Sequence, residues 1–326
     1  MADAAGLSRT GEVKGLGRSS IADYAPTYGA LAALVLLLIF NSIFTTNFFD
    51  VNNFRTILIQ VAPTMLVAVG MTMVIATGGI DLSVGSVMAI ASAVAATSLG
   101  YGAGIAVLLA LVVATVVGAF NGTLISVFRI QPIIVTLAVL ISGRGIAQVL
   151  SNGGQLISFD NPSFEYLGKG ILAGIPVQVI VMVLVVALAV FLMRATAFGR
   201  YVLAVGGNEA AARLAGIKTH RTKITVYALS GLLAGLAGLV ETARLGASDA
   251  QKVGLNIELD AIAATVVGGT ALTGGRATVL GTLVGALIMQ VITTSFNMRG
   301  YSVSWGFVIK AAIILIAVYI QRPKVA

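Results

Sequence analysis

The sequence predicts an all-α protein that crosses a membrane about ten times, and its composition indicates this in three ways. The mean hydropathy is +1.02. Of the 326 residues, 58% are hydrophobic and 10% are charged. Soluble domains carry about 25% charged residues, so this composition is suited to lipid. At ~20 residues to a span, the length allows about ten spans with short connections.

Ten apolar runs follow one another along the chain, and each predicts a helix. They cover residues 27–45, 57–77, 83–100, 103–127, 131–150, 171–193, 223–243, 259–275, 277–296 and 302–320. The run 171–193 contains no charge and is long enough to span with some tilt. The runs 83–100 and 259–275 are short and rich in small residues, so either could be a broken or re-entrant segment.

Basic residues between the runs predict the orientation, because lysine and arginine are retained on cytoplasmic loops. With the N-terminus inside and ten spans, Arg129, the loop 194–223, Arg276 and the C-terminal residues lie on the cytoplasmic side. The outer side keeps single basic residues, namely Arg55, Lys169, Arg244, Lys252 and Arg299. An odd number of spans would place the basic C-terminus outside, so an even number is expected.

The chain divides into three predicted parts. Residues 1–26 lack the apolar core of a signal peptide and are expected to be a disordered cytoplasmic tail. Residues 27–321 form the transmembrane domain, and residues 322–326 form a short cytoplasmic tail.

The residue types exclude several kinds of chemistry. The chain has no cysteine, which excludes disulfides and thiolate metal sites. Its single histidine, His220, lacks the partners of a metal or catalytic site. No G-x-x-x-x-G-K-[ST], H-E-x-x-H or G-x-S-x-G motif occurs, so we expect neither ATP binding by this chain nor an enzymatic site of its own.

The longest polar interruption, residues 194–223, is strongly basic and contains a short predicted helix. Asn208 is suited to the N-cap after the flexible pair Gly206–Gly207. Glu209 suits the positive end of the helix, and Gly216 can end it in a left-handed conformation. Two turns of helix, roughly 12 Å long, are marginal alone in water. The loop is therefore either a basic connection or a docking helix for a cytoplasmic partner.

Five polar residues within or beside the apolar runs are candidates for a pathway or a gate: Asp81, Asn121, Gln131, Thr136 and Arg144. Asp81 could line a pathway, or it could cap the helix that follows it. Arg144 cannot face lipid cheaply, so it needs a partner such as Asp81, Asp160 or Asp260, or an interface to which it extends. The uncharged three suit a polyol pathway, but helix-to-helix hydrogen bonds use the same residue types.

Glycine patterns predict close helix contacts. Three pairs have the small-xxx-small spacing, namely Gly118 and Gly122, Gly231 and Gly235, and Gly281 and Gly285. In addition, residues 77–85 and 267–275 share the pattern GG-x-x-L-[ST]-x-G. Broken, glycine-rich segments of this kind often belong to internal repeats of transporters. The span count places both segments near the cytoplasmic face, which does not suit an inverted repeat, so the similarity could also be chance.

Four stretches together resemble the inner-membrane permeases of sugar ABC importers, the group that contains ribose and galactofuranose permeases. They are residues 70–89 with TGGIDLSVG, residues 121–148, residues 204–217 with AVGGNEAAARLAGI, and residues 246–276. The last two look closest to the galactofuranose-type branch. The resemblance implies the fold of a type II ABC importer permease, a multi-pass protein of the bacterial inner membrane.

The resemblance also implies partners. These are a second permease copy or a paralogue, two cytoplasmic ATPase subunits that bind the ATP, and a periplasmic sugar-binding protein. The loop 194–223 matches the position of the coupling helix that enters a groove on the ATPase. By this resemblance, the coupling residues are Gly207, Asn208, Glu209, Ala212, Arg213 and Gly216. We expect no cofactor and no nucleic acid.

Three other readings are weighed against a monosaccharide permease. A branched-chain amino acid ABC permease shares the architecture, but TGGIDLSVG and ELDAIAATVVGG look sugar-type. If the protein were an ion-coupled secondary transporter, the capped helix would have no explanation. Asp81 would be its one weak candidate for an acid that couples ion binding to transport. No feature of the sequence favours a structural or signalling membrane protein. The sequence does not decide which sugar is carried, or whether the two permeases are identical.

Overall fold

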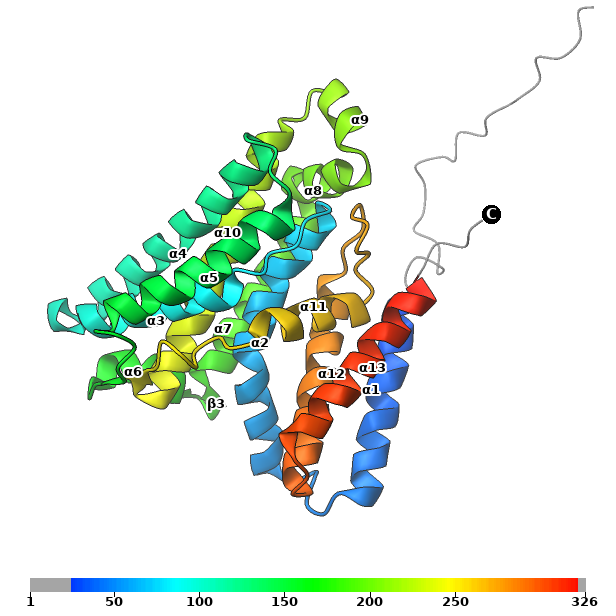
Figure 1. The fold of residues 1–326 in the computed structure, drawn as a ribbon. Coiled ribbons are helices and arrows are strands. Elements are labelled where there is room, and N and C mark those ends of the chain that lie inside the picture. Colours follow the sequence, from blue (N-terminus) through cyan, green and yellow to red (C-terminus); the bar gives the residue numbers. More distant parts are fainter. Residues whose placement is uncertain (1–24, 322–326) are drawn as a thin grey trace, which may run out of the picture.

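The structure is a computed structural model that describes residues 25–321, and most of these residues are helical (Figure 1). The helices are α1 (Ala25–Phe44), α2 (Val51–Ala76), α3 (Val84–Ser98), the short 3₁₀ helix η2 (Leu99–Tyr101), α4 (Ala103–Ser126), α5 (Pro132–Leu150), α6 (Pro162–Lys169), α7 (Val177–Ala195), α8 (Ala197–Gly207), α9 (Glu209–Leu214), α10 (Thr219–Leu245), α11 (Ile257–Val267), α12 (Val279–Met298) and α13 (Val303–Gln321). Two antiparallel strand pairs join β1 (Ile157–Ser158) to β4 (Ala247–Ser248), and β2 (Ile171–Leu172) to β3 (Ile175–Pro176).

Each of the ten predicted apolar runs corresponds to a helix, which confirms an all-α polytopic membrane protein. Within the described range, eight helices are long and apolar enough to cross a membrane, and α13 carries a shorter apolar stretch. Helix α11 has 11 residues and is too short to span. The predicted tails, 1–26 and 322–326, lie outside the described residues except for the two that begin α1.

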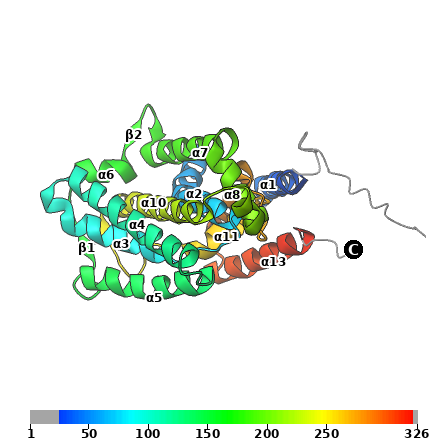
Figure 2. The same ribbon diagram turned by 90° about the horizontal axis from the view of Figure 1, so that it is seen from above.

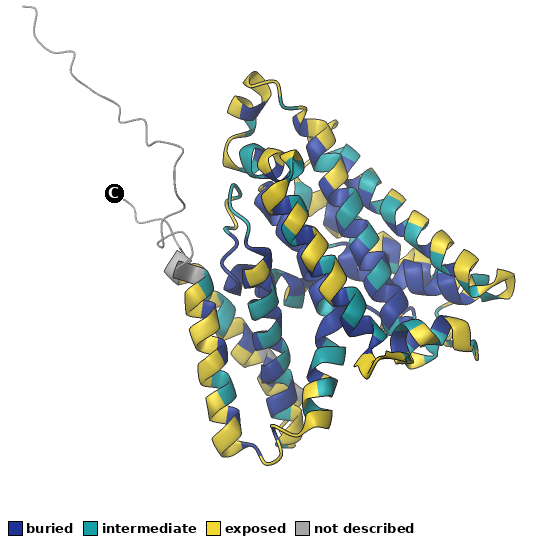
Figure 3. Ribbon diagram, turned by 180° about the vertical axis from the view of Figure 1, so that it is seen from behind, coloured by how far each residue is buried: buried dark blue, intermediate teal, exposed yellow. Residues whose placement is uncertain are grey.

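The core is built around α2 and α10, which lie in the middle of the bundle when it is seen from above (Figure 2). All residues from 65 to 76 of α2 are buried. Helix α10 packs against α4, α2 and α3. The outer helices α1 and α13 turn apolar side chains outward, where lipid or another apolar surface must cover them (Figure 3).

The three glycine pairs lie at close helix contacts, as predicted. A Cβ on Gly118 would lie 2.2 Å from the carbonyl oxygen of Tyr227, and one on Gly285 would lie 2.1 Å from that of Ala264. Any larger residue would push the backbones of α4 and α10, or of α11 and α12, apart. Close backbone packing of this kind holds helices together where water does not drive association.

The predicted span 171–193 begins too early. Residues 171–176 form the hairpin of β2 and β3, and α7 starts only at Val177. The reason is local, because Ala173 and Gly174 both have a positive φ, of 51° and 83°. Two such residues in succession produce a tight hairpin turn, which a helix cannot contain.

Only the second of the two short runs is broken. Helix α3 has 15 residues, nearly all buried, and continues into η2, so residues 84–101 form an apolar segment long enough to span. Helix α11 ends at Val267, and a glycine-rich loop, residues 268–278, leads to α12. Most residues of both α3 and α11 are buried.

The loops predicted to be cytoplasmic gather at one end of the bundle. Residues 127–131, the segment from α8 to the start of α10, and the loop 268–278 all lie at the upper end in Figure 1. A pocket joins Arg129 to Arg213 and Lys218 at this end. The starts of α2 and α13 and the hairpin of β2 and β3 lie at the other end.

Candidate functional site

Helix α9, Glu209–Leu214, is the short helix predicted in the basic loop. The Asn208 side chain caps it and accepts a hydrogen bond from the backbone N–H of Ala211 at 2.9 Å. Gly216 follows with a φ of 84° and donates its N–H to the carbonyl of Arg213. Both predicted caps are confirmed. Each satisfies backbone groups that a helix end leaves open.

Glu209 fixes α9 to the start of α10. Its carboxylate accepts a hydrogen bond from the Lys223 ammonium at 2.6 Å and lies 3.5 Å from the Arg213 guanidinium. Partial burial alone would raise the pKa of Glu209, but Lys223 and Arg213 hold that pKa below its usual value. The single acid of the loop therefore serves as its clamp.

The outer surface of α9 offers an apolar anchor. Leu214 is 90% exposed, whereas Ala212 is 5% exposed and faces the protein. Arg213 is exposed beside Leu214. The resemblance assigned coupling to Ala212 and Arg213 but not to Leu214. The sequence did not set Leu214 apart from the other apolar residues of the loop; its exposure in the structure marks it as an anchor that could fit a groove on a partner.

The pair Gly206–Gly207 is not a flexible linker, contrary to the prediction. These residues form the last turn of α8. A Cβ on Gly206 would lie 1.8 Å from the carbonyl oxygen of Ala76, the last residue of α2. Glycine is needed here for close backbone approach and not for freedom of movement.

The two glycine-rich segments, 77–85 and 267–275, meet beside this contact. The N–H of Gly275 donates to the carbonyl of Ala76 at 3.0 Å. Gly274 has a φ of 83°, and a Cβ on it would lie 2.8 Å from the carbonyl oxygen of Gly206 and 3.0 Å from the nitrogen of Gly78. Both segments thus lie at the same end of the bundle, as the span count predicted. We call the contact of Gly206, Ala76 and Gly275 the glycine junction.

Asp81 does not cap α3, so the first of its two alternatives, a pathway residue, stays open and the second, a helix cap, is wrong. The N-cap residue is Ser83, which makes no side-chain cap. One oxygen of Asp81 accepts hydrogen bonds from the Ser83 N–H and hydroxyl at 3.1 and 2.6 Å, and the other accepts from the Ser230 hydroxyl at 2.8 Å. Asp81 is 1% exposed. The carboxylate therefore ties the loop between α2 and α3 to α10.

Two of the uncharged candidates hold the same loop. Asn121 of α4 donates to the Ser83 hydroxyl at 2.8 Å, and Thr136 of α5 donates to the carbonyl of Ile80 at 3.3 Å. Both are fully buried. The structure therefore brings Asp81, Asn121 and Thr136 together around one loop. Gln131 is not part of this group, because it is the exposed N-cap residue of α5.

Arg144 has none of the predicted acidic partners. Its guanidinium donates to the carbonyls of Ala250 and Val253 at 3.0 and 2.7 Å. These carbonyls belong to the turn between β4 and α11, so backbone dipoles satisfy the charge. The side chain is half-buried, and the acid with the largest electrostatic influence on it is Glu258 rather than Asp81, Asp160 or Asp260.

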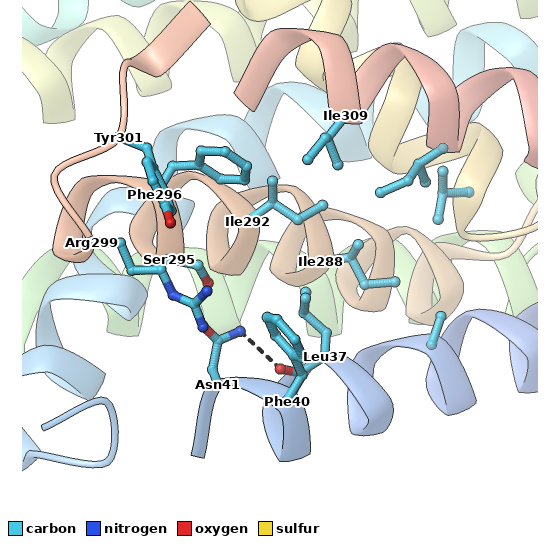
Figure 4. A pocket seen from close by; sticks show the side chains of 13 residues that line it. Leu37, Phe40, Asn41, Ile288, Ile292, Ser295, Phe296, Arg299, Tyr301 and Ile309 are labelled. Atoms are coloured by element: carbon cyan, nitrogen blue, oxygen red, sulfur yellow. Dashed lines mark hydrogen bonds between the residues drawn. The ribbon is translucent and has the colours of Figure 1, made fainter. Parts of the chain in front are cut away.

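Two cavities lie near the C-terminal helices. The first, of about 360 Å³, lies between α1, α12 and α13 and is almost wholly apolar (Figure 4). At its end the Arg299 guanidinium stacks on the Phe40 ring at 5.0 Å, and Asn41 donates to the carbonyl of Leu37. The second, of about 630 Å³, lies between α11, α12 and α13 and carries polar groups. Lys310 donates there to Asp260 at 2.9 Å.

The fold and these sites define a multi-pass membrane protein that carries a capped, exposed helix at one end. The comparisons give the family. The family model of the permease component of branched-chain amino acid transport systems matches residues 53–318. The chain belongs to this family and, within it, to the permeases of sugar ABC importers.

Individual relatives agree with this assignment. The ribose import permease protein RbsC of Escherichia coli (strain K12) is 42% identical over 300 residues, which cover 90% of this chain and 93% of the relative. The galactofuranose transporter permease protein YtfT of the same strain is 41% identical, with coverages of 90% and 89%. The fructose import permease protein FruF of Bifidobacterium longum (strain NCC 2705) is 36% identical, with coverages of 91% and 87%. No solved structure matches the chain.

Proposed function

We propose that this chain forms the transmembrane path of an ATP-driven monosaccharide importer and that a separate ATPase subunit drives it. The substrates in the names of its relatives are ribose, galactofuranose and fructose, which are all monosaccharides. The identities to the ribose and galactofuranose permeases differ by one percentage point. Ribose is therefore as good a first substrate to test as galactofuranose, and the lean to the galactofuranose branch stays a prediction.

The observation that carries the proposal is the construction of α9. It is capped at both ends, held by Glu209 to α10, and presents the exposed Leu214. A helix this short is not stable alone in water, so its rigid attachment suits a docking function. A groove on the ATPase that receives Leu214 and Arg213 would complete it.

Movement of α9 has a direct route into the membrane domain. The glycine junction lies in the last turn of α8, two residues before the N-cap of α9, where Gly206 contacts Ala76 and the N–H of Gly275 bonds to Ala76. Helix α2 and the loop 268–278 are thus both in contact with α8. Closure of an ATPase pair beneath α9 would tilt α8 and shift these two elements together. The contacts are between backbones, so no flexible side chain lies between the elements to accommodate the displacement.

Asp81, Asn121 and Thr136 have a gating role in this proposal. They hold the loop that follows α2 against α10, α4 and α5. Because this loop directly follows α2, a shift of α2 would first strain the hydrogen bonds that hold the loop. Gln131 and Arg144 remain candidates at the edges of the same region.

The partners in this proposal are a pair of ATPase subunits at the α9 end, a second permease, and a sugar-binding protein at the opposite end. The basic α9 end is the cytoplasmic one, and both termini are cytoplasmic. The chain itself needs no cofactor, because the partner binds the ATP. A homodimer and a heterodimer of permeases remain equally open.

Reconstitution into proteoliposomes tests the proposal. The chain is combined with an ATPase subunit and a sugar-binding protein, and uptake of labelled ribose, fructose, galactofuranose and leucine is measured. We expect uptake of at least one sugar that needs both ATP and the binding protein, and none of leucine. Uptake of leucine, or sugar uptake driven by an ion gradient without the ATPase, would contradict it.

A further inference from the structure

The larger of the two cavities, between α11, α12 and α13, is lined by polar side chains and lies at the side of the bundle. Six polar side chains line it: Asn256, Asp260, Gln290, Thr293, Asn297 and Lys310. Its volume of about 630 Å³ falls within the roughly 300–1,000 Å³ of small-molecule sites. Leu255 and Leu259 at its rim are 60% and 56% exposed, so the cavity is open toward the side of the bundle. We call it the polar pocket.

The charges of the polar pocket lie at membrane depth. Lys310 is the eighth residue of α13, about 10 Å along the helix from its start. Its ammonium bonds to Asp260 at 2.9 Å, with 11% and 34% of the two side chains exposed. A partly exposed ion pair at this depth is costly against lipid tails, and such residues normally face a water-filled cavity or another protein surface.

The polar pocket is also connected to α2. Gln290 of α12, which lines the pocket, donates to the side-chain oxygen of Gln60 in α2 at 2.6 Å. The other end of α2 lies at the glycine junction. A displacement of α2 would therefore reach the pocket through this hydrogen bond.

We infer that the polar pocket is one half of the sugar path and that a second permease closes it from the side. The inference rests on the proposed function and adds the residues that line the path. Sugar hydroxyls can donate to the Asp260 carboxylate and accept from the Lys310 ammonium, and Gln290 and Thr293 add neutral partners. Because the two charges already satisfy each other, the pocket holds a sugar weakly, as a path requires.

The location suits a shared path. Helices α5 and α13 lie along the same side of the bundle, with α7 on the opposite side (Figure 2). Along this side α5 exposes apolar residues such as Ile134 and Ile141. A second permease that packs on α5 and α13 would place its own polar pocket opposite this one, and each pocket would be incomplete without the other.

Single cysteines test the inference, because the chain contains none. Thr293→Cys and Ala311→Cys place thiols in the pocket, and Val308→Cys, at a 58% exposed position of α13 outside it, is the matched control. The variants are assembled with cysteine-free ATPase and binding protein and exposed to a charged, membrane-impermeant methanethiosulfonate reagent. Since the thiolate that reacts forms only near water, we expect the pocket cysteines to react roughly tenfold faster than the control. Modification should also block sugar uptake.

Labelled ribose, fructose and galactofuranose are supplied to the unmodified variants in parallel. If the variants import sugar but the pocket cysteines react no faster than Val308→Cys, with and without ATP, the pocket assignment is wrong and the proposed function stands. If neither the variants nor the unaltered chain import any of the three sugars, the proposed function fails as well.

Discussion

At the scale of single residues, Asp81 has the most demanding position, because its carboxylate is buried and joins segments far apart in the chain. Replacing it with alanine leaves the hydroxyls of Ser83 and Ser230 without an acceptor. An unsatisfied buried group costs about 1–3 kcal/mol, so Asp81→Ala should lower the unfolding temperature clearly. Thermal unfolding of the purified protein in detergent measures this.

Asp81→Asn is the control for this prediction. The amide keeps one oxygen as an acceptor, so its loss of stability should be smaller than that of alanine. Equal unfolding temperatures for the two variants would show that the hydrogen bonds of the carboxylate do not stabilise the loop.

Glu209 gives a pH-dependent prediction. Its pKa is lowered in the folded protein, so the ionised form stabilises α9 at pH values above the ordinary pKa of roughly 4.3. This contribution is lost as the pH falls through the lowered folded pKa. The side chain is 37% exposed, so the contribution is below about 1 kcal/mol. Hydrogen exchange of residues 208–216 should therefore accelerate in acid relative to the rest of the protein.

The variant Glu209→Gln separates this effect from general acid unfolding. It should exchange faster at neutral pH and show little further relative change on acidification. A variant that exchanges like the unaltered chain at neutral pH would remove Glu209 from its role as the clamp of α9.

Residue partners were the least predictable part of the site. The caps at Asn208 and Gly216 follow from local backbone chemistry, and the structure confirms both. The partners of Asp81 and Arg144 depend on which distant elements meet. Ser230 is 149 positions from Asp81, and the carbonyls bound by Arg144 belong to an unpredicted turn. Lys310 lies inside an apolar run, and the sequence alone did not identify Asp260 as its partner.

At the scale of elements, the glycine junction makes a prediction with a matched control on the neighbouring residue. A Cβ on Gly206 would lie 1.8 Å from a backbone oxygen of α2, whereas one on Gly207 would have its nearest neighbour at 4.0 Å. Gly206→Ala should therefore displace α8 from α2, lower the unfolding temperature and reduce ATP-dependent uptake. Gly207→Ala should leave the unfolding temperature close to that of the unaltered chain.

Both quantities can be measured on the same preparations, by thermal unfolding and by uptake into proteoliposomes. If Gly206→Ala were as stable and as active as Gly207→Ala, the close contact of α8 with α2 would have no part in stability or coupling.

The elements themselves were largely predictable, because apolar runs of about 20 residues leave few alternatives in a membrane. The predicted helix boundaries were wrong where an apolar stretch contains residues that form a turn. Residues 171–176 are apolar enough to extend α7, but Ala173 and Gly174 form a hairpin turn. Helix α8 was not predicted because it lies in a basic loop, and its two terminal glycines are typical of a linker.

At the scale of the whole molecule, the account requires that one end of the bundle receives the ATPase and that the far end receives the sugar. The basic loops, α9 and the glycine junction share one end. The polar pocket lies nearer the other, and α2 runs between them. The composition predicted a membrane protein and the basic residues predicted its ends, but the packing of α8 on α2 required the three-dimensional structure.

The most direct test of this arrangement is a photoreactive amino acid at position 214, in cells that express the whole transporter. Leu214 is 90% exposed at the α9 end, and Leu156, 60% exposed in the loop between α5 and β1, serves as the control. We predict that position 214 cross-links to the ATPase subunit and that position 156 does not. Cross-linking of position 214 to the sugar-binding protein, or to lipid alone, would contradict the account.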